Sequence, residues 1–115
     1  MLVIDVGGEP VGQVHWFPVH YGPQSASKAL RLGIALVPES RGKGYGSAAQ
    51  RLLAEYLFAS TNLHRLEAGT DLENIAEQRA LEKAGFEREG VVRQSQYRDG
   101  RYRDMVMFSR LRTDK

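Results

Sequence analysis

Apolar runs separated by glycine and proline dominate the first third of the chain. Leu2 to Val6 and Val11 to Val19 are rich in branched and aromatic residues, and Gly7-Gly8 lies between them. Two turn-forming residues between β-prone runs are typical of a tight hairpin. A third run, Leu30 to Val37, ends at Pro38, which has no N–H to donate to a sheet. The pattern predicts three strands, with an exposed loop before the third.

The spacing of the apolar residues becomes helical after the third strand. One face carries apolar residues three and four positions apart, namely Ala49, Leu52, Leu53, Tyr56 and Leu57. This spacing predicts a helix from about Gly44 to Ala59. Arg65 to Thr70 then predicts a fourth strand. A strand, a turn, a helix and a further strand in this order form a crossover unit.

A second helix and a final hairpin complete the pattern. Asn74 and Glu77 have the spacing of a helix-capping box. Phe86 to Tyr97 and Tyr102 to Leu111 are β-like, and the Asp-Gly pair between them is typical of a type I′ turn. We therefore predict a single domain over residues 1–115 that mixes α and β structure.

The stretch Arg41-Gly42-Lys43-Gly44-Tyr45-Gly46 joins the third strand to the first helix. Its glycines allow a sharp turn and a close approach of the backbone to a ligand. The helix that follows presents unpaired N–H groups and the positive end of its dipole, which together bind anions. Neither the dinucleotide pattern nor the P-loop pattern is present. We expect this loop to bind the pyrophosphate of a nucleotide-like cofactor.

Composition limits the remaining possibilities. A chain of 115 residues with 42% hydrophobic residues suits one core. No run approaches the roughly 18 apolar residues of a membrane span, so we expect a soluble, cytoplasmic protein. The absence of cysteine excludes disulfides, thiolate metal sites and a cysteine nucleophile. His15, His20 and His64 do not have metal-ligand spacings, and we expect no metal.

Positive charge gathers toward the C-terminus, although the net charge of the chain is only +2. Residues 86–115 contain eight basic residues and five acidic ones. An RNA-binding tail is therefore an alternative function. The arginines alternate with acids and apolar residues, which favours a solvated strand face, and we expect neither a nucleic-acid nor a membrane partner.

Two motifs resemble those of a known family. The pattern R-x-x-G-x-G resembles the coenzyme A pyrophosphate loop of the GNAT superfamily of N-acetyltransferases. The segment from Asn74 to Phe86 looks like the helix that follows the fifth strand there, and the tail is similar to the Rim-type branch, which acetylates protein N-terminal amines and, in relatives, small amines. The resemblance covers about residues 1–112. It implies a mostly antiparallel sheet, splayed at the cofactor strand, and direct acetyl transfer from acetyl-CoA to a primary amine.

The resemblance also implies which residues contact acetyl-CoA. Backbone groups of Ile34, Ala35 and Leu36 would pair with the pantetheine arm. Asn74 would reach the same arm or the sulfur, although capping its helix explains this residue equally well. The loop residues that would hold the pyrophosphate are Arg41, Gly42, Lys43, Gly44, Tyr45, Gly46 and Ser47.

The chemistry requires a neutral amine, and therefore a base or a water relay. Glu67 is the first candidate, because its position resembles that of the glutamate assigned this role in Rim-type enzymes. The alternative for Glu67 is a structural ion pair with a nearby arginine. His15 is the second candidate, since its pKa suits the task, and the alternative is a packed strand residue.

The usual proton donors are missing. Leu81 stands where many relatives have a tyrosine, and Glu77 replaces the serine of the Rim-type pattern; we favour a capping role for Glu77. Tyr45, Tyr97 and Tyr102 remain candidate donors. The missing donors favour an alternative function, a catalytically idle CoA-binding or protein-interaction module.

The family's usual strand and two helices before the first hairpin have no counterpart in the chain. Without them, an edge strand stays unpaired and apolar surface stays uncovered. We therefore expect a homodimer. The alternative is a fragment of a longer protein, with an incomplete acceptor site.

Overall fold

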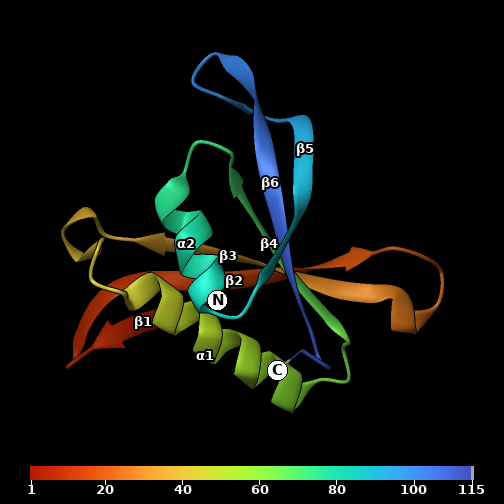
Figure 1. The fold of residues 1–115 in the computed structure, drawn as a ribbon. Helices are drawn as coiled ribbons and strands as arrows, with labels where there is room; N and C mark the ends of the chain where they lie inside the picture. Colours follow the sequence, from red (N-terminus) through yellow and green to blue (C-terminus); the bar gives the residue numbers. More distant parts are fainter. Residues whose placement is uncertain (115) are drawn as a thin grey trace.

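The computed structural model describes residues 1–114, which form one six-stranded sheet with two helices against one face (Figure 1). Two 3-10 turns, η1 (Ser25–Ser27) and η2 (Pro38–Ser40), flank the third strand. Within these residues, neither helix is long and apolar enough to cross a bilayer. The elements are β1 (Leu2–Val6), β2 (Glu9–His20), β3 (Lys28–Leu36), α1 (Tyr45–Ser60), β4 (Arg65–Asp71), α2 (Ile75–Lys83), β5 (Glu87–Arg98) and β6 (Arg101–Leu111).

Both predicted hairpins are confirmed. The β1–β2 turn places Gly7 at φ 60° and Gly8 at φ 88°, and the β5–β6 turn places Asp99 at φ 54° and Gly100 at φ 79°. A type I′ turn needs a positive φ at both central residues, which glycine adopts freely and aspartate tolerates.

The sheet has the strand order β1-β2-β3-β4-β6-β5, and each neighbouring pair is antiparallel except β3 with β4. The parallel pairing is short and joins Leu30–Leu32 to Leu66–Ala68. Beyond it β3 continues to Leu36 and β4 to Asp71, and the two strands diverge (Figure 1). The predicted mostly antiparallel sheet, splayed at the cofactor strand, is confirmed.

Alternation along the strands separates two faces of the sheet. On one face the buried residues Leu32, Leu66 and Phe108 pack with Leu53 and Leu57 of α1 to form the core. Burying each such side chain stabilises the fold by about 1.5–3 kcal/mol. The sequence neighbours of these residues, such as Gly33, Arg65 and Met107, point to the opposite face, where they border a cavity. The two-residue period of a strand thus puts the hydrophobic core on one face of the sheet and the cavity on the other.

The N-terminus of α2 confirms one part of the predicted capping box and contradicts the other. Asn74 Oδ1 accepts the N–H of Glu77 at 3.1 Å, as an N-cap does. The N–H of Asn74, however, donates to the carbonyl of Asp71, and Glu77 Oε1 accepts from Gln50 Nε2 at 3.2 Å. The capping role expected for the Glu77 side chain is therefore wrong: this side chain joins α2 to α1, and burial raises its pKa.

Candidate functional site

The split between β3 and β4 exposes a strand edge inside the sheet. Ile34 and Leu36 pair with Val14 and Gly12 of β2 on one side, whereas toward β4 this end of β3 lies beyond the last parallel pair. Unpaired backbone groups at such an edge need other partners, and an extended ligand can provide them. The predicted pantetheine residues, Ile34, Ala35 and Leu36, all lie on this segment.

The glycine loop follows directly from this edge. Gly42 and Gly44 have φ values of 77° and 82°, and a Cβ at either position would meet no atom within 4 Å. Gly44 is the N-cap of α1, so the amides of the first turn have no partner within the helix. Arg41 and Lys43 are exposed at its rim. The arrangement suits an anion that approaches the backbone closely.

The loop and the open strand edge belong to one site. A Cβ on Gly46 would lie 3.6 Å from Leu36 Cδ1 and 3.8 Å from Ile34 Cδ1, so the first turn of α1 packs against the free end of β3. Ser47 is buried, and its Oγ donates to the carbonyl of Gly44 at 3.1 Å. A ligand lying along β3 would therefore reach the glycine loop with its far end.

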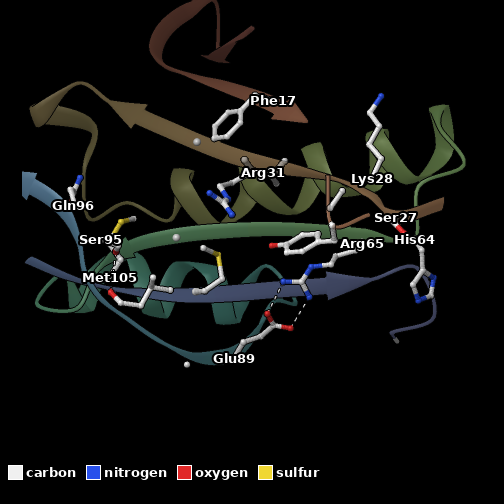
Figure 2. A pocket seen from close by; sticks show the side chains of 18 of the residues that line it. Phe17, Ser27, Lys28, Arg31, His64, Arg65, Glu89, Ser95, Gln96 and Met105 are labelled. Carbon is white, nitrogen blue, oxygen red and sulfur yellow. Dashed lines mark hydrogen bonds and ion pairs between the residues drawn. The ribbon is translucent and has the colours of Figure 1, made fainter. Parts of the chain in front are cut away.

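A cavity of about 1130 Å³ lies on the sheet face that points away from the helices. Figure 2 views this face with both helices behind the sheet. Gly33 of β3 and Gly69 of β4, each one residue past the parallel pairs, border the cavity at the start of the split. A Cβ on Gly33 would overlap the His15 ring, and one on Gly69 would lie 3.3 Å from the terminal carbons of Met105 and Met107. The backbone of Gly33 and Gly69, which carry no side chain, thus forms the floor of the cavity at this point.

Glu67 lies beside this cavity and is fully buried. Its carboxylate accepts hydrogen bonds from Tyr21 Oη at 2.7 Å, from Arg31 Nε at 2.8 Å and Nη2 at 2.5 Å, and from Arg65 Nε at 2.9 Å. Burial alone would raise the pKa of Glu67, but the hydrogen bonds from Tyr21, Arg31 and Arg65 outweigh it and hold that pKa below its ordinary value. The structure contains the ion pair considered as an alternative, and the catalytic role of Glu67 stays a prediction.

A second carboxylate in the cavity is also engaged. Arg65 donates from Nη1 to Glu89 Oε2 at 2.7 Å and from Nη2 to Glu89 Oε1 at 2.6 Å (Figure 2). Ser109 Oγ donates to Glu89 as well, at 2.8 Å. The hydrogen bonds from Arg65, followed by that from Ser109, lower the pKa of Glu89 to about 2. Arg65 therefore links two carboxylates.

His15, the second candidate base, is exposed and lies at the level of the split. It pairs with Gly33 in the β2–β3 register, and its ring lies over that glycine. A neutral imidazole accepts a proton at one of its ring nitrogens. Of the two candidate bases, His15 has the more accessible side chain, and its catalytic role stays a prediction.

The candidate proton donors lie in different places. Tyr97 and Tyr102 pack edge to face, 5.1 Å between ring centroids, at the far end of the projecting β5–β6 hairpin (Figure 1). Tyr45 begins α1, and Leu81 is buried in the core. Sequence reasoning missed Tyr21, which borders the cavity and donates to Glu67 from a segment expected only to be an exposed loop. No local pattern marks a contact between residues 46 positions apart.

A second cavity of about 340 Å³ continues from the first. Gly69, Gln96 and Met105 border both cavities, and Asn74 borders the smaller one. The alternative role of Asn74 as a helix cap is confirmed, and its contact with the cofactor stays a prediction. Within residues 1–114, no group of three or more His, Asp and Glu is arranged to hold a metal ion.

The arginines of the C-terminal segment make internal contacts. Arg98 Nη2 and Arg103 Nε both donate to Asp71 Oδ2 at 2.7 Å. Arg112 donates to three carbonyls around the C-terminus of α1, those of Phe58, Thr61 and Leu63. These arginines therefore fasten the last two strands to the rest of the fold.

Comparisons with known proteins agree with this geometry. A family model described as "Acetyltransferase (GNAT) domain" matches residues 1–87. The chain is 38% identical over 76 residues to "Probable N-acetyltransferase YjcK" of Bacillus subtilis, a match that covers 66% of this chain and 40% of that protein. It thus spans less than half the length of this curated relative.

Two solved structures share the fold. Mycobacterium smegmatis RimJ in complex with CoA-disulfide is 28% identical with a TM-score of 0.83, over 95% of this chain and 51% of that one. The ribosomal-protein-S5-alanine acetyltransferase from Vibrio fischeri is 26% identical with a TM-score of 0.81, over 93% of this chain and 57% of that one.

Proposed function

Because the chain belongs to the GNAT acetyltransferase family, we propose that it transfers an acetyl group from acetyl-CoA to a primary amine. The observation that carries the proposal is the split between β3 and β4, with a glycine loop at its end and a cavity at its start. One site thereby offers an anion cradle, an open strand edge and room for an acceptor.

The cofactor half of the proposal assigns each segment a part. The amides from Gly42 to Ser47 hold the pyrophosphate, and Arg41 and Lys43 add positive charge at the rim. The open edge from Ile34 to Leu36 pairs with the pantetheine amides as a further strand would. The thioester then lies near the start of the split, where a backbone N–H of β3 stabilises the oxyanion of the tetrahedral intermediate.

For the proton transfer, we propose that His15 accepts the proton of the attacking amine, directly or through water. The lowered pKa of Glu67 makes its carboxylate a weak base, whereas the His15 side chain is exposed and its ring lies over Gly33 at the start of the split. Glu67 instead fixes Arg31, Arg65 and Tyr21 around the acceptor cavity. The amine nitrogen bonds to the thioester carbonyl carbon, the C–S bond breaks, and the leaving CoA thiolate takes up a proton from solvent, so no covalent enzyme intermediate is needed.

The acceptor and the partner are also part of the proposal. The similarity to the ribosomal-protein-S5-alanine acetyltransferase favours a protein amine as the acceptor, and a small amine is the other candidate. We propose a homodimer because β1 is an edge strand whose Leu2 and Val3 are 46% and 61% exposed. Light scattering at micromolar concentration tests this state, and a well-folded monomer would exclude it. The cytoplasmic location stays a prediction.

A catalytically idle CoA-binding module is the second candidate function. It is favoured by Leu81, which is buried and has no proton to donate where many relatives have a tyrosine. Two measurements separate the candidates: calorimetry with CoA, and release of CoA from acetyl-CoA with a panel of amines. Because the chain has no cysteine, any free thiol that appears comes from CoA alone. Binding without thiol release would support the idle module, and absence of binding would reject both.

A further inference from the structure

The larger cavity is bordered by more positive than negative charge. Lys28, Arg31 and Arg65 line it, and Glu89 is the acidic residue among its lining side chains. Glu89 accepts hydrogen bonds from both terminal nitrogens of Arg65. Glu67 is fully buried and accepts hydrogen bonds from Arg31 and Arg65. Both carboxylates already accept hydrogen bonds from arginines. Within this cavity, a substrate with several ammonium groups would meet guanidinium groups whose carboxylate partners are already engaged.

Arg31 has donors left for a ligand. Its Nε and Nη2 are bonded to Glu67, whereas Nη1 donates to no residue within 1–114. The side chain is 34% exposed and borders the cavity, and its guanidinium lies 6.0 Å from the centroid of the Phe17 ring. The two hydrogen bonds to Glu67 fix the guanidinium, and the Phe17 ring lies beside it. Figure 2 shows the Arg31 and Phe17 side chains on this face of the sheet. A fixed guanidinium with free N–H groups is a good receptor for a carboxylate.

The position of Arg31 relates it to the site of transfer. Arg31 and Gly33 lie on the same face of β3, two residues apart, which is about 7 Å along a strand. Gly33 marks the start of the split and the floor beneath His15. When the nitrogen of an acceptor lies above Gly33, Arg31 can therefore contact a substituent that is only a few bonds away from that nitrogen.

We infer that the acceptor amine carries a carboxylate close to its amino group, and that Arg31 binds this carboxylate. The inference rests on the proposed acetyltransferase function and specifies its substrate class. The carboxylate belongs either to a free amino acid or to an acidic residue near the N-terminus of a peptide. Diamines and polyamines are poor substrates for the same reason.

Matched acceptors test the inference and distinguish the two sources. The first pair is alanine and alaninamide, with rates expressed per neutral amine. The second pair is the peptide amides Ala-Asp-Ala and Ala-Asn-Ala, which differ in one carboxylate. We expect kcat/KM to favour the carboxylate in at least one pair by about tenfold, which corresponds to about 1.4 kcal/mol. Equal rates within both pairs, or a faster reaction with spermidine, would overturn the inference.

Variants assign the preference to Arg31. Arg31→Gln is expected to bring the ratio within the preferred pair close to one, and Arg31→Lys, which retains a charge for Glu67 but loses the free guanidinium donors, is expected to lower it in part. Lys83→Met removes an exposed charge from α2 on the opposite side of the sheet and should leave the ratio unchanged. Because a ratio is measured, general damage to the fold lowers both rates and does not imitate the result.

A binding measurement keeps the test independent of turnover. With CoA present, N-acetylalanine and N-acetylalaninamide are titrated and followed by saturation-transfer NMR. Tighter binding of the carboxylate form, lost in Arg31→Gln, supports the inference even when no acceptor reacts. Equal or absent binding within this pair, and also within the acetylated Ala-Asp-Ala and Ala-Asn-Ala amides titrated in the same way, overturns it. Failure to bind CoA in calorimetry would instead reject the proposed function.

Discussion

Arg31 and Glu67 face each other in the middle of the three residue pairs that join β3 to β4. Their ion pair crosses the last part of the sheet where the two halves are still connected, directly before the strands diverge. Arg65 and Tyr21 complete the contacts of the buried carboxylate. The contacts among these four residues therefore fix the geometry at the start of the split. Three of the four, Tyr21, Arg31 and Arg65, also border the larger cavity.

Glu67→Gln is expected to lower both stability and activity. The amide keeps an acceptor oxygen but loses the charge that Arg31 and Arg65 surround, so we expect a loss of roughly 1–3 kcal/mol in unfolding free energy. Turnover should fall at every pH, because Arg31, Arg65 and Tyr21 lose the charged acceptor that positions their side chains. Urea unfolding and a pH–rate profile measure the two effects.

The matched control for this variant is Glu55→Gln, on the exposed face of α1, which should change neither quantity. A pH–rate profile in which Glu67→Gln regains activity at high pH would contradict the positioning role. That result would make Glu67 the base, as the family resemblance implies.

His15→Gln is expected to lower kcat/KM at neutral pH by about 100-fold, the lower range for loss of a general base. The deficit should shrink as the pH approaches the pKa of the amine, where the acceptor is already neutral. Affinity for CoA should stay unchanged, because the ring contacts Gly33 and not the glycine loop. His20→Gln, an exposed position at the end of the same strand, is the control. Equal profiles for the two variants would assign the proton to solvent.

The sequence predicted those features that depend on neighbouring residues. Gly44 and the Asp99-Gly100 turn were identified because a left-handed backbone limits the residue type to very few choices. Strand and helix bounds followed from periodicity and were right to within about two residues. The sequence alone therefore predicts an anion site at the glycine loop, and this role stays a prediction.

Contacts across the sheet could not be predicted in the same way. The bond from Tyr21 to Glu67 depends on the register of β3 against β4 and on the path of a loop. The bond from Gln50 to Glu77 depends on how two helices pack. The spacing of Asn74 and Glu77 also fits a capping box, and only the packing of the two helices shows that the Glu77 side chain contacts Gln50 of α1 instead.

The stability of the protein is expected to fall in acid, in part through Asp71. The N–H of Glu73, then Arg98 and Arg103, lower the pKa of this carboxyl from 3.8 to about 2. A depressed folded-state pKa stabilises the fold above the unfolded value, and this contribution is lost as the pH falls from about 4 to about 2. Thermal unfolding between pH 6 and pH 2 measures it.

Asp71→Asn should show a smaller decrease in Tm over this range than the parent protein, since the variant no longer has the titrating group. Asp5→Asn, at an exposed position of β1, is the control and should follow the parent. A decrease in Asp71→Asn as steep as that of the parent would assign the acid sensitivity to other carboxylates, such as Glu89.

Gly44→Val is expected to weaken CoA binding by at least about tenfold. The space beside Gly44 is open, so the new side chain occupies the place where phosphate would approach the amides of α1. The backbone at Gly44 has φ 82°, and a branched residue there adds strain of roughly 1–2 kcal/mol, which lowers stability independently of any ligand. Calorimetry with CoA and thermal unfolding are therefore measured together.

Gly100→Val separates strain from loss of the binding site. Gly100 has φ 79° and equally open surroundings, but it lies at the tip of the β5–β6 hairpin. Both substitutions impose a similar backbone cost, so both should lower the Tm by a similar amount, and only Gly44→Val should lose affinity for CoA. If the two variants bind CoA equally well, the pyrophosphate does not lie on this loop. If both lose affinity together, the loss comes from the fold, and the assignment of the loop then has no support from this experiment.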